Sequence, residues 1–287
     1  MTVNISLIGA GSMAEALIAG WTNEQNNGRY HKHIQVTNHS NNTRLRYLEE
    51  TYQVKAERDP ASLIQHSDVI ILACKPKDWQ EALTPYLDYF TPEHTLISVM
   101  AGITTEDFES FFPFRIPVIR AIPNTSAVVN EAMTPYACGQ HMTPSKHKIF
   151  KNLFLDIGDI QVVDENQMDA MTALTGTGPA YIYYLMESME KAAIQEGIDP
   201  EMARKLVSQT LLGAGIRVKS EDIPPKILYE QIMSPGGTTE AGFKILQEHQ
   251  VQSSVIDCIS AACNRSKELG QSLTSNSKLK PDTTDKQ

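Results

Sequence analysis

One change of pattern along the chain constrains its fold more than any other feature. Up to Val163, short β-rich runs alternate with amphipathic segments, which indicates βαβ units around a mostly parallel sheet. The runs are VNISLI, IQVTN, DVIILAC, TLISVM, PVIRAI and IQVV. DVIILAC is almost continuously apolar, as expected of a central strand covered on both faces. These patterns predict an α/β domain with a doubly wound, mostly parallel sheet.

After Glu165 the β-rich runs end, and a helical spacing of apolar residues takes over. We expect a sheet domain over residues 1–163, an all-helical domain over 164–272 and a disordered polar tail over 273–287. The tail lacks aromatic residues and cannot bury enough apolar surface to become ordered. The helical half carries more apolar faces than one subunit can bury. It is therefore predicted to form an interlocked homodimer, with a larger assembly of dimers as a further option.

The composition argues against several classes of protein. A net charge of −9 gives a surface that repels phosphate backbones, so nucleic acid is not an expected partner. No apolar run approaches the ~20 residues that cross a bilayer, and the start of the chain lacks the basic and apolar regions of a secretory leader. We therefore expect a cytoplasmic protein with no membrane partner.

Neither the cysteines nor the histidines form a recognisable disulfide or metal pattern. The four cysteines include no C-x-x-C pair, and the run His31–His33 has no further ligands nearby. We interpret the histidine run as surface and the cysteines as small buried apolar residues. The cysteines are Cys74, Cys138, Cys258 and Cys263. No metal site is expected.

A glycine-rich turn follows the first expected strand. Gly9, Gly11 and Ala14 form the pattern G-x-G-x-x-A between VNISLI and a helical segment. In this context the first glycine permits a tight turn, the second permits close approach of a pyrophosphate, and the small third residue packs the helix on the strand. Amides at the helix start then face the phosphates. The pattern predicts a Rossmann-type dinucleotide site at Gly9, Ala10, Gly11, Ser12 and Met13.

The end of the second expected strand indicates which dinucleotide binds. An NAD site usually has Asp or Glu there, which accepts hydrogen bonds from the ribose hydroxyls. Here Asn38, His39 and Ser40 follow the strand, Arg44 lies close behind, and the loop contains no acid. Hydrogen-bond donors and positive charge suit a 2′-phosphate. We expect NADPH to be preferred, with NADH as a second option; the alternative is a polar loop whose arginines serve only the next helix.

Later strands of the sheet also end in candidate site residues. Ligands of open α/β sheets bind at the carboxyl ends of the strands. The segments ACKPK, VMAGIT and AIPNTSA all begin there. We expect the cofactor cleft to be lined by Cys74, Lys75, Pro76, Ala101, Gly102 and Asn124. Ala101, Gly102 and Asn124 are assigned to the neighbourhood of the nicotinamide.

The helical half contains two further glycine-rich motifs, LTGTGPAY and MSPGGTTEAGF. Helix starts next to such glycines expose amides that attract anions, carboxylates included. Simple N-caps at Thr177 and Thr238 are the plainer alternative. The hydroxyls nearby exceed what two caps require. They belong to Thr175, Thr177, Ser234, Thr238 and Thr239. We predict a pocket for a small carboxylate with a neutral hydroxyl donor.

Together, these motifs resemble the pyrroline-5-carboxylate reductase family. The resemblance rests on IGAGSMAEALIAG, ACKPK, AIPNTSA, LTGTGPAY and MSPGGTTEAGFKILQE, and it extends from Val3 to about Gly270. It implies a Rossmann domain followed by an all-α dimerisation domain. It also implies reduction of the cyclic imine Δ1-pyrroline-5-carboxylate to L-proline with NAD(P)H, the last step of proline synthesis.

The resemblance further implies roles for individual residues. The amides around Gly236, Gly237 and Thr238 would hold the substrate carboxylate, and the Thr239 hydroxyl would face the ring nitrogen. Two acidic residues would border the pocket, and these are Glu165 and Glu221. A cyclic imine is basic enough to be partly protonated near neutrality, so Thr239 is expected to orient the substrate first and to deliver a proton second.

Two other functions stay open at this point. A β-hydroxyacid dehydrogenase would need a lysine general acid on the first interdomain helix, and MDAMTALTGTGPAYIYY contains none. A non-catalytic NADPH-binding paralogue with a regulatory role would need the fold but not two intact motifs. The joint presence of the glycine turn and the G-G-x-T block favours the enzyme.

Overall fold

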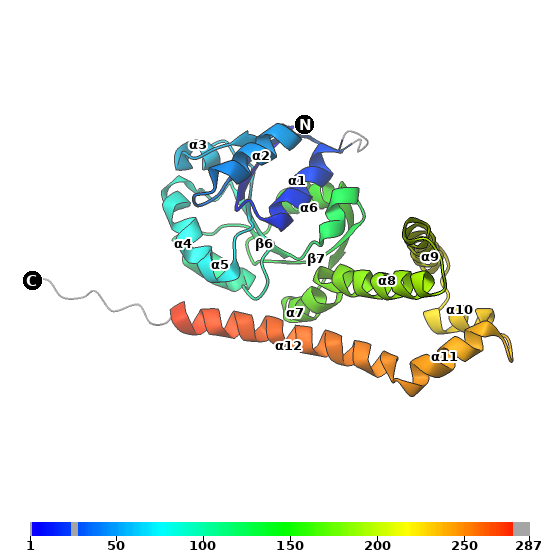
Figure 1. Ribbon diagram of the computed structural model, residues 1–287. Helices are drawn as coiled ribbons and strands as arrows, with labels where there is room; N and C mark the ends of the chain where they lie inside the picture. Colours follow the sequence, from blue (N-terminus) through cyan, green and yellow to red (C-terminus); the bar gives the residue numbers. More distant parts are fainter. Residues whose placement is uncertain (1, 24–27, 278–287) are drawn as a thin grey trace, which may run out of the picture. The chain divides into compact units, whose positions relative to one another are not determined.

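The computed structural model describes residues 2–23 and 28–277 (Figure 1). The chain divides into two compact units. The first unit comprises the described parts of Met1–Thr177 and Ala261–Gln287, and the second unit is Gly178–Ser260. The first unit contains a mostly parallel sheet with helices on both faces, and every element of the second is a helix. The predicted fold class is confirmed.

The sheet has eight strands in the order β3-β2-β1-β4-β5-β6-β7-β8. All neighbours are parallel except β6 and β7, which are antiparallel. The strands are β1 (Thr2–Ile8), β2 (His31–Thr37), β3 (Lys55–Ala56), β4 (Val69–Leu72), β5 (Thr95–Ser98), β6 (Val118–Ala121), β7 (Ala132–Cys138) and β8 (Gly158–Val162). The strand order reverses between β1 and β4, which is where open sheets of this type bind ligands.

Two hydrophobic clusters, one on each face, hold the sheet between its helices. One cluster joins strand residues such as Leu7 and Val36 to Leu17 and Leu48 of α1 and α2, and to Phe150 of α6. The other joins residues of β4 and β5 to α3, α4 and α5. Besides part of a later helix, the α-helices of this unit are α1 (Ser12–Thr22), α2 (Asn42–Tyr52), α3 (Pro60–Ile64), α4 (Trp79–Leu83), α5 (Thr105–Phe111), α6 (Pro144–Leu155) and α7 (Met168–Met171). Strands β4, β5 and β6 are buried throughout, which explains their continuous apolar runs.

Side-chain caps fix where several of these helices begin. Asn41 accepts a hydrogen bond from the Arg44 amide, and Asp59 accepts one from Ser62. Thr104 and Asp107 form a reciprocal capping box at the start of α5. These caps lie in the loops after β2, β3 and β5, so they also hold the loops that follow the carboxyl ends of those strands.

Two strands were not among the predicted runs. β3 is only two residues long, and β7 has the sequence AMTPYAC. Proline in a run argues against an interior strand because it has no amide hydrogen to donate. Here the Pro135 carbonyl accepts from the Ile122 amide at 2.9 Å, and Pro135 lies opposite Gln161 of β8. Pairing on both sides therefore makes this segment a strand despite its composition.

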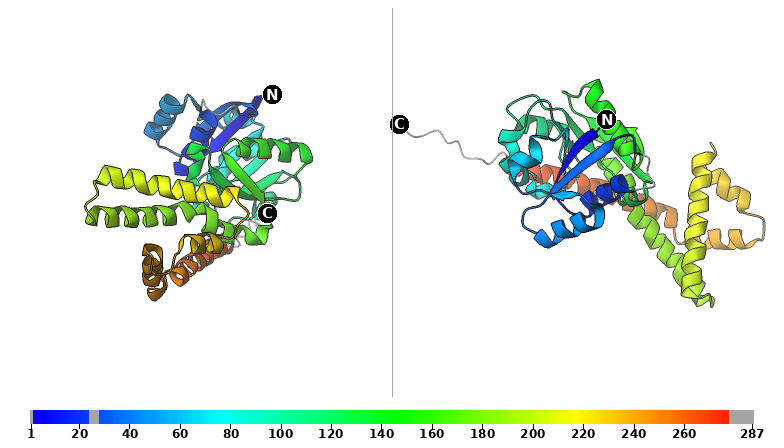
Figure 2. Two further views of the ribbon diagram at one scale, coloured as in Figure 1. Left: turned by 90° about the vertical axis from the view of Figure 1, so that its right-hand side faces the viewer. Right: turned by 90° about the horizontal axis from the view of Figure 1, so that it is seen from above.

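The second unit consists of α8 (Gly178–Gln195), α9 (Pro200–Ser220), α10 (Pro225–Ile232), α11 (Thr238–Glu248) and the first part of α12 (Val251–Ser277). Figure 2 shows these helices from two further sides. Few of its apolar side chains are buried within the unit, Val207 and Leu228 among them. Exposed ones include Tyr183, Tyr184, Met202, Leu206, Leu212, Ile216, Ile232, Ile245 and Ile256. Apolar exposure of this extent marks an interaction surface.

The compact units divide the chain differently from the predicted domains. Residues 164–177 belong to the first unit, because Met168 is buried against Ile122 and Ala137. The second half of α12 also belongs to the first unit. The helix continues to Ser277, so residues 273–277 are helical rather than disordered, since an established helix gains one hydrogen bond per added residue. The rest of the predicted tail, 278–287, lies outside the described residues.

Two sequence expectations concern surface features. Cys138 and Cys258 are exposed, so the interpretation of all four cysteines as buried was wrong. Cys138 is the last residue of β7, and Cys258 lies in α12 within the largely unburied second unit.

Among residues 2–23 and 28–277, no helix combines the length and apolar character needed to cross a lipid bilayer.

Candidate cofactor and substrate sites

The turn between β1 and α1 requires glycine at its first position. Gly9 has a φ of 117°, and its amide donates to the Thr37 carbonyl at 3.0 Å. A Cβ added at Gly9 would lie 2.5 Å from the carbonyl carbon of Ala73. Glycine is thus the residue that allows both the backbone angle and the close approach of β1, β2 and β4 at their carboxyl ends.

The second glycine of the turn leaves open space at the start of α1. Gly11 is the N-cap residue of α1 and makes no side-chain cap, and a Cβ added there would meet no atom within 4 Å. Ser12 is exposed, and Met13 is half-buried. Ala14 is fully buried and packs the helix on the sheet. First-turn amides have no acceptor within a helix, and the open space at Gly11 leaves room for a pyrophosphate, so the turn suits the predicted cofactor.

Arg44 holds this turn rather than standing free at the surface. Its Nε donates to the Ala10 carbonyl at 2.8 Å, and its guanidinium forms an ion pair with Glu15. Tyr47 and Tyr52 also donate to Glu15. Burial opposes ionisation of Glu15, but the hydrogen bonds from Arg44, Tyr52 and Tyr47 outweigh it and lower the pKa of Glu15. Burial and the neighbouring carboxylate raise the pKa of Tyr52 to about 12.

The loop after β2 is organised by an arginine that the sequence analysis did not single out. Arg58 donates to the carbonyls of Asn38 and His39, the latter at 3.0 Å, and to Asn42 Oδ1 at 2.6 Å. The Asn38 side chain in turn accepts from the Asn41 amide at 2.9 Å. Because Arg58 follows the two-residue strand β3, only the pairing of β3 with β2 brings it here. His39 and Ser40 are exposed beside it.

The loops after β4 and β5 contain the next group of predicted residues. The Cys74 thiol donates to the Met100 sulfur at 3.5 Å. Burial, reinforced by Asp78, raises the pKa of Cys74 to about 11, so the thiol stays protonated at neutral pH. Lys75 is exposed, and Pro76 begins a short 3₁₀ helix, Pro76–Asp78. The side chains of this loop that reach solvent are therefore Lys75 and Lys77, both exposed.

Gly102 contacts a residue from the far end of the chain. Its φ is +80°, and a Cβ added there would lie 2.9 Å from the Gly270 amide nitrogen. A Cβ at Gly270 of α12 would likewise lie 2.5 Å from the Gly102 carbonyl oxygen. Ala101 and Gly102 are half-buried. The predicted nicotinamide loop is thus covered by α12, and Gly270 is a contact that local sequence patterns could not reveal.

Asn124, Thr175 and Thr177 are connected through the backbone. Asn124 is 6% exposed, accepts from the Ser126 amide at 3.1 Å and donates to the Thr175 carbonyl at 3.0 Å. Residues Thr172–Gly176 form a π-helix, a distortion often found at functional sites. The hydroxyls of Thr175 and Thr177 donate to carbonyls of Met171 and Ala173. The Thr175 oxygen has further capacity to accept a hydrogen bond.

In the second unit, the predicted carboxylate loop joins α10 to α11. The ring centroids of Tyr229 in α10 and Phe243 in α11 lie 4.8 Å apart, with the rings tilted by 33°. This contact joins the two helices that flank the loop. Gly236 has a φ of +72°, and its amide donates to the Glu240 carboxylate at 2.6 Å. Gly237 is the N-cap residue of α11, so the alternative that Thr238 is a simple N-cap is wrong.

The hydroxyl-bearing residues of this loop differ in exposure. Ser234 and Thr238 are exposed, and Thr239 is half-buried in the first turn of α11. The Ser234 carbonyl accepts from the Gly237 amide at 2.9 Å. Glu221 lies beyond the end of α9 and forms an exposed ion pair with Arg217 at 3.2 Å. The Gly236 and Gly237 amides are thus engaged within the chain, and what the loop can offer a ligand is the first-turn amides of α11 and the partly shielded Thr239 hydroxyl.

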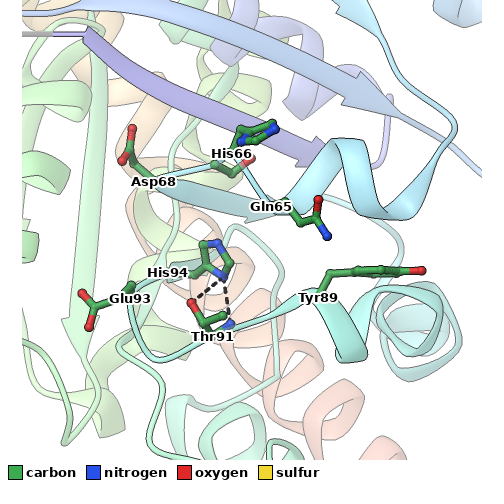
Figure 3. Close-up of a pocket in the computed structure, with 8 residues that line it drawn as sticks. Gln65, His66, Asp68, Tyr89, Thr91, Glu93 and His94 are labelled. Carbon is green, nitrogen blue, oxygen red and sulfur yellow. Dashed lines mark hydrogen bonds between the residues drawn. The ribbon is translucent and has the colours of Figure 1, made fainter.

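A cavity of about 300 Å³ lies near the amino ends of β4 and β5, opposite the carboxyl ends at which the predicted site residues lie (Figure 3). Its lining is polar and comes from the loops that precede β4 and β5. The lining residues are Gln65, His66, Ser67, Asp68, Tyr89, Thr91, Glu93 and His94. None of them is a predicted site residue. Burial, assisted by the positive charge of Lys146, lowers the pKa of His94, whose ring accepts from the Thr91 amide at 2.9 Å.

Within the described part of the chain, no group of three or more His, Cys, Asp or Glu side chains could hold a metal ion. His31–His33 lie at the start of β2. The candidate sites therefore depend on backbone amides, hydroxyls and arginines.

Comparisons with known proteins identify the family. A family model described as pyrroline-5-carboxylate reductase dimerisation matches residues 165–269, and one described as NADP oxidoreductase coenzyme F420-dependent matches residues 4–102. Pyrroline-5-carboxylate reductase 2 of Bacillus subtilis (strain 168) is 41% identical over 265 residues, 92% of this chain and 94% of the relative. The chain belongs to the pyrroline-5-carboxylate reductase family. The predicted family and the predicted NAD(P)-dependent oxidoreductase class are confirmed.

Solved structures of the pyrroline-5-carboxylate reductase family are similar along almost the whole chain. The Plasmodium falciparum pyrroline carboxylate reductase with NADP bound has a TM-score of 0.84 and 28% identity, covering 93% of this chain and 98% of its own. The Streptococcus pyogenes 1-pyrroline-5-carboxylate reductase has a TM-score of 0.83 and 27% identity, covering 93% and 99%. Both the sheet unit and the helices are therefore typical of the family.

Proposed function

We propose that this protein reduces Δ1-pyrroline-5-carboxylate to L-proline with NADPH as the preferred cofactor and NADH as a second one. The proposal rests on two backbone features, the turn at the start of α1 and the loop at the start of α11. The turn at Gly11 leaves room at a helix start, and the Gly236 amide donates to the Glu240 carboxylate, so a carboxylate fits beside the start of α11. The turn at Gly11 suits a pyrophosphate, and the first-turn amides of α11 suit the carboxylate of a small substrate.

The cofactor would be held by residues of the first unit. The turn Gly9–Met13 would bind the pyrophosphate, while Asn38, His39 and Ser40 would face the ribose, with Arg58 supplying positive charge. Bound NADPH supplies a hydride to the imine carbon. The loop 38–46 contains arginine and no acid, which supports the preference for NADPH over NADH.

The substrate would be oriented by the loop at the start of α11. First-turn amides of a helix have no acceptor within the helix, so those around Gly237 and Thr238 are suited to the substrate carboxylate. The Thr239 hydroxyl would accept from or donate to the ring nitrogen. As a neutral alcohol it is a weak acid, so its main role is to hold the already basic imine in place. Glu221 and Ser234 belong to the same unit as this loop and are proposed to contact the substrate there. The substrate roles of Glu165, Thr175 and Thr177, which belong to the first unit, stay predictions from the sequence.

A homodimer is the proposed working form, and an assembly of dimers is the further option. The second unit exposes large apolar side chains such as Tyr184 and Ile216, and the matched family domain is described as a dimerisation domain. Burying such surface is the main source of stability in subunit association. The expected cytoplasmic location stays a prediction.

One assay tests the function directly. Purified protein is mixed with pyrroline-5-carboxylate and NADPH, the loss of NADPH absorbance is followed, and proline is identified by chromatography. The assay is repeated with NADH. Turnover that yields proline would establish the reductase and rank the cofactors. Silence with both cofactors, in folded protein that binds NADPH, would favour the non-catalytic paralogue.

A further inference from the structure

A buried arginine lies at the carboxyl end of β6, outside the residues assigned above. Arg120 is 2% exposed, and its neighbours in β6 are buried as well. A buried guanidinium is stable only when it is paired with hydrogen-bond acceptors. Its contacts therefore determine what surrounds this end of the strand.

Two carboxylates from a later segment meet this arginine. Its Nη1 lies 3.0 Å from Glu165 Oε1, and its Nη2 lies 3.1 Å from Asp169 Oδ1. The Thr105 hydroxyl donates to the second oxygen of Glu165 at 3.0 Å. The Ser266 hydroxyl of α12 donates to Asp169 at 2.8 Å across 97 positions of sequence. One cationic side chain thus ties β6 to α5, α7 and α12.

The segment held in this way contains predicted substrate residues. It runs from Glu165 to Thr177 and includes α7 and the π-helix Thr172–Gly176. Its far end is held by Asn124, which donates to the Thr175 carbonyl at 3.0 Å. Arg120 lies near the carboxyl end of β6 and Asn124 in the loop that follows it, so one stretch of chain anchors both ends of the segment.

Stability alone does not explain why the buried Arg120 pairs with two carboxylates, Glu165 and Asp169. The Arg120 Nε is buried and has no hydrogen-bond partner within the described residues. An unpaired buried donor costs free energy, and apolar replacements of buried ion pairs are often neutral or stabilising. Two separate carboxylates on one planar guanidinium instead fix the relative positions of Glu165 and Asp169, because the fork is rigid.

We propose that Arg120 is a positioning residue for the reductase reaction. Acting through Glu165 and Asp169, with Ser266 as a support, it holds residues 165–177 in the conformation that receives the substrate. The proposal rests on the proposed function, because it assigns the segment to the substrate rather than to the cofactor. It adds three residues, Arg120, Asp169 and Ser266, to those the sequence pointed out.

The test uses full-length protein with three variants and two matched controls. The variants are Arg120→Lys, Arg120→Met and Ser266→Ala, and the controls are Arg115→Lys and Ser110→Ala. Arg115 and Ser110 are exposed in the same unit. Each protein is measured for kcat and KM with pyrroline-5-carboxylate, for NADPH affinity by fluorescence, and for amide hydrogen exchange of residues 168–177 against β1.

Loss of positioning should lower kcat/KM for pyrroline-5-carboxylate by up to about 100-fold in Arg120→Met, because small misplacements of binding groups carry penalties of this order. Arg120→Lys keeps the charge without the fork and should lose about tenfold. Ser266→Ala should lose about threefold, the equivalent of less than one hydrogen bond. NADPH affinity should change by less than about twofold, and exchange should rise in 168–177 but not in β1.

Other outcomes would overturn the proposal. It fails if a folded Arg120 variant keeps wild-type kcat/KM, or if NADPH affinity falls in parallel, which would indicate general damage to the sheet. If both Arg120 variants fail to fold, Ser266→Ala decides: unchanged kinetics and exchange would reject the proposal. If wild-type protein lacks imine turnover, the proposed function fails, and the exchange of 168–177 alone then decides whether Arg120 holds this segment.

Discussion

The two units of the molecule differ in how far their apolar side chains are buried. In the first unit, apolar residues such as Leu17 and Phe150 are fully buried on the two faces of the sheet. In the second, Tyr184 and Ile216 are 70% and 58% exposed. The first unit can therefore organise its glycine turn by itself, whereas the second needs another surface to cover it.

The two glycine motifs differ in where their steric constraints come from. At the first motif, a Cβ added at Gly9 would collide with the backbone that follows β4, whereas Gly11 faces open space. At the second, a Cβ added at Gly237 would lie 2.5 Å from Ser234 Oγ of the same loop, and Gly236 needs its positive φ but faces open space. The loop is shaped locally, and its surroundings must come from substrate or partner.

Gly9→Ala should give the largest effect on the self-contained unit. The new Cβ would overlap the Ala73 backbone at a φ of 117°, where L side chains are strained. We expect a loss of about 4 kcal/mol in the free energy of unfolding and no measurable NADPH binding. Urea denaturation and NADPH fluorescence would measure both.

Gly11→Ala is the matched control, because its Cβ would meet no atom of the chain. Stability should change by less than about 1 kcal/mol, while NADPH affinity should fall because the methyl group occupies the pyrophosphate space. Equal stabilities for the two alanine variants would contradict the steric reading of Gly9.

Ile216→Asp should disrupt the proposed subunit interface formed by the second unit. The residue is 58% exposed in the single chain, so the charge costs little there, but burial in a subunit interface would cost about 3 kcal/mol or more. Light scattering should show a smaller particle than for wild type. Val129→Asp, at a residue 65% exposed in the first unit, is the control and should keep the wild-type mass.

Thr239→Ala tests the hydroxyl of the second motif. We expect kcat to fall by about 100-fold, because the imine loses its orienting partner, while NADPH binding stays nearly unchanged. Thr239→Ser retains the hydroxyl and should lose much less. A wild-type rate in the alanine variant would remove Thr239 from the mechanism.

Asn41→Asp sharpens the assignment of the cofactor. The Asn41 side chain accepts from the Arg44 amide as the cap of α2, and aspartate can make the same cap. The added charge should repel a 2′-phosphate and shift the ratio of NADPH to NADH efficiency by about tenfold toward NADH. An unchanged ratio would show that the ribose binds elsewhere.

Local patterns predicted the elements better than the contacts. The strands with continuous apolar runs and the helical character of the chain after Glu165 were expected, because burial on one or two faces leaves a period in the sequence. Pro135 concealed β7, whose strand structure depends on pairing with β6 and β8. Residues such as Arg58, Gly270 and Ser266 act across long separations, which no local spacing records.

Arg44 makes contacts within the chain that the sequence did not reveal. Its guanidinium holds Glu15 and the Ala10 carbonyl. Its expected contact with a phosphate of the cofactor stays a prediction. Positive charge near the loop after β2 then comes from Arg58, which follows a strand too short to be predicted.

Removing the charge of Glu15 should give the smallest effect on the free energy of unfolding. The direction in which this effect changes with pH tests whether Glu15 acts through its charged form. Its pKa is lowered in the folded protein from the ordinary 4.5, so its stabilising contribution is complete above that value and is lost as the pH falls through the folded pKa. Glu15→Gln should therefore cost about 1 kcal/mol or less at neutral pH, because the group is only partly shielded. Urea unfolding of both proteins at neutral and strongly acidic pH should show the difference shrinking with acid. A difference that grows with acid would mean that Glu15 acts through its neutral form, and the network would then hold the glycine turn by packing rather than by charge.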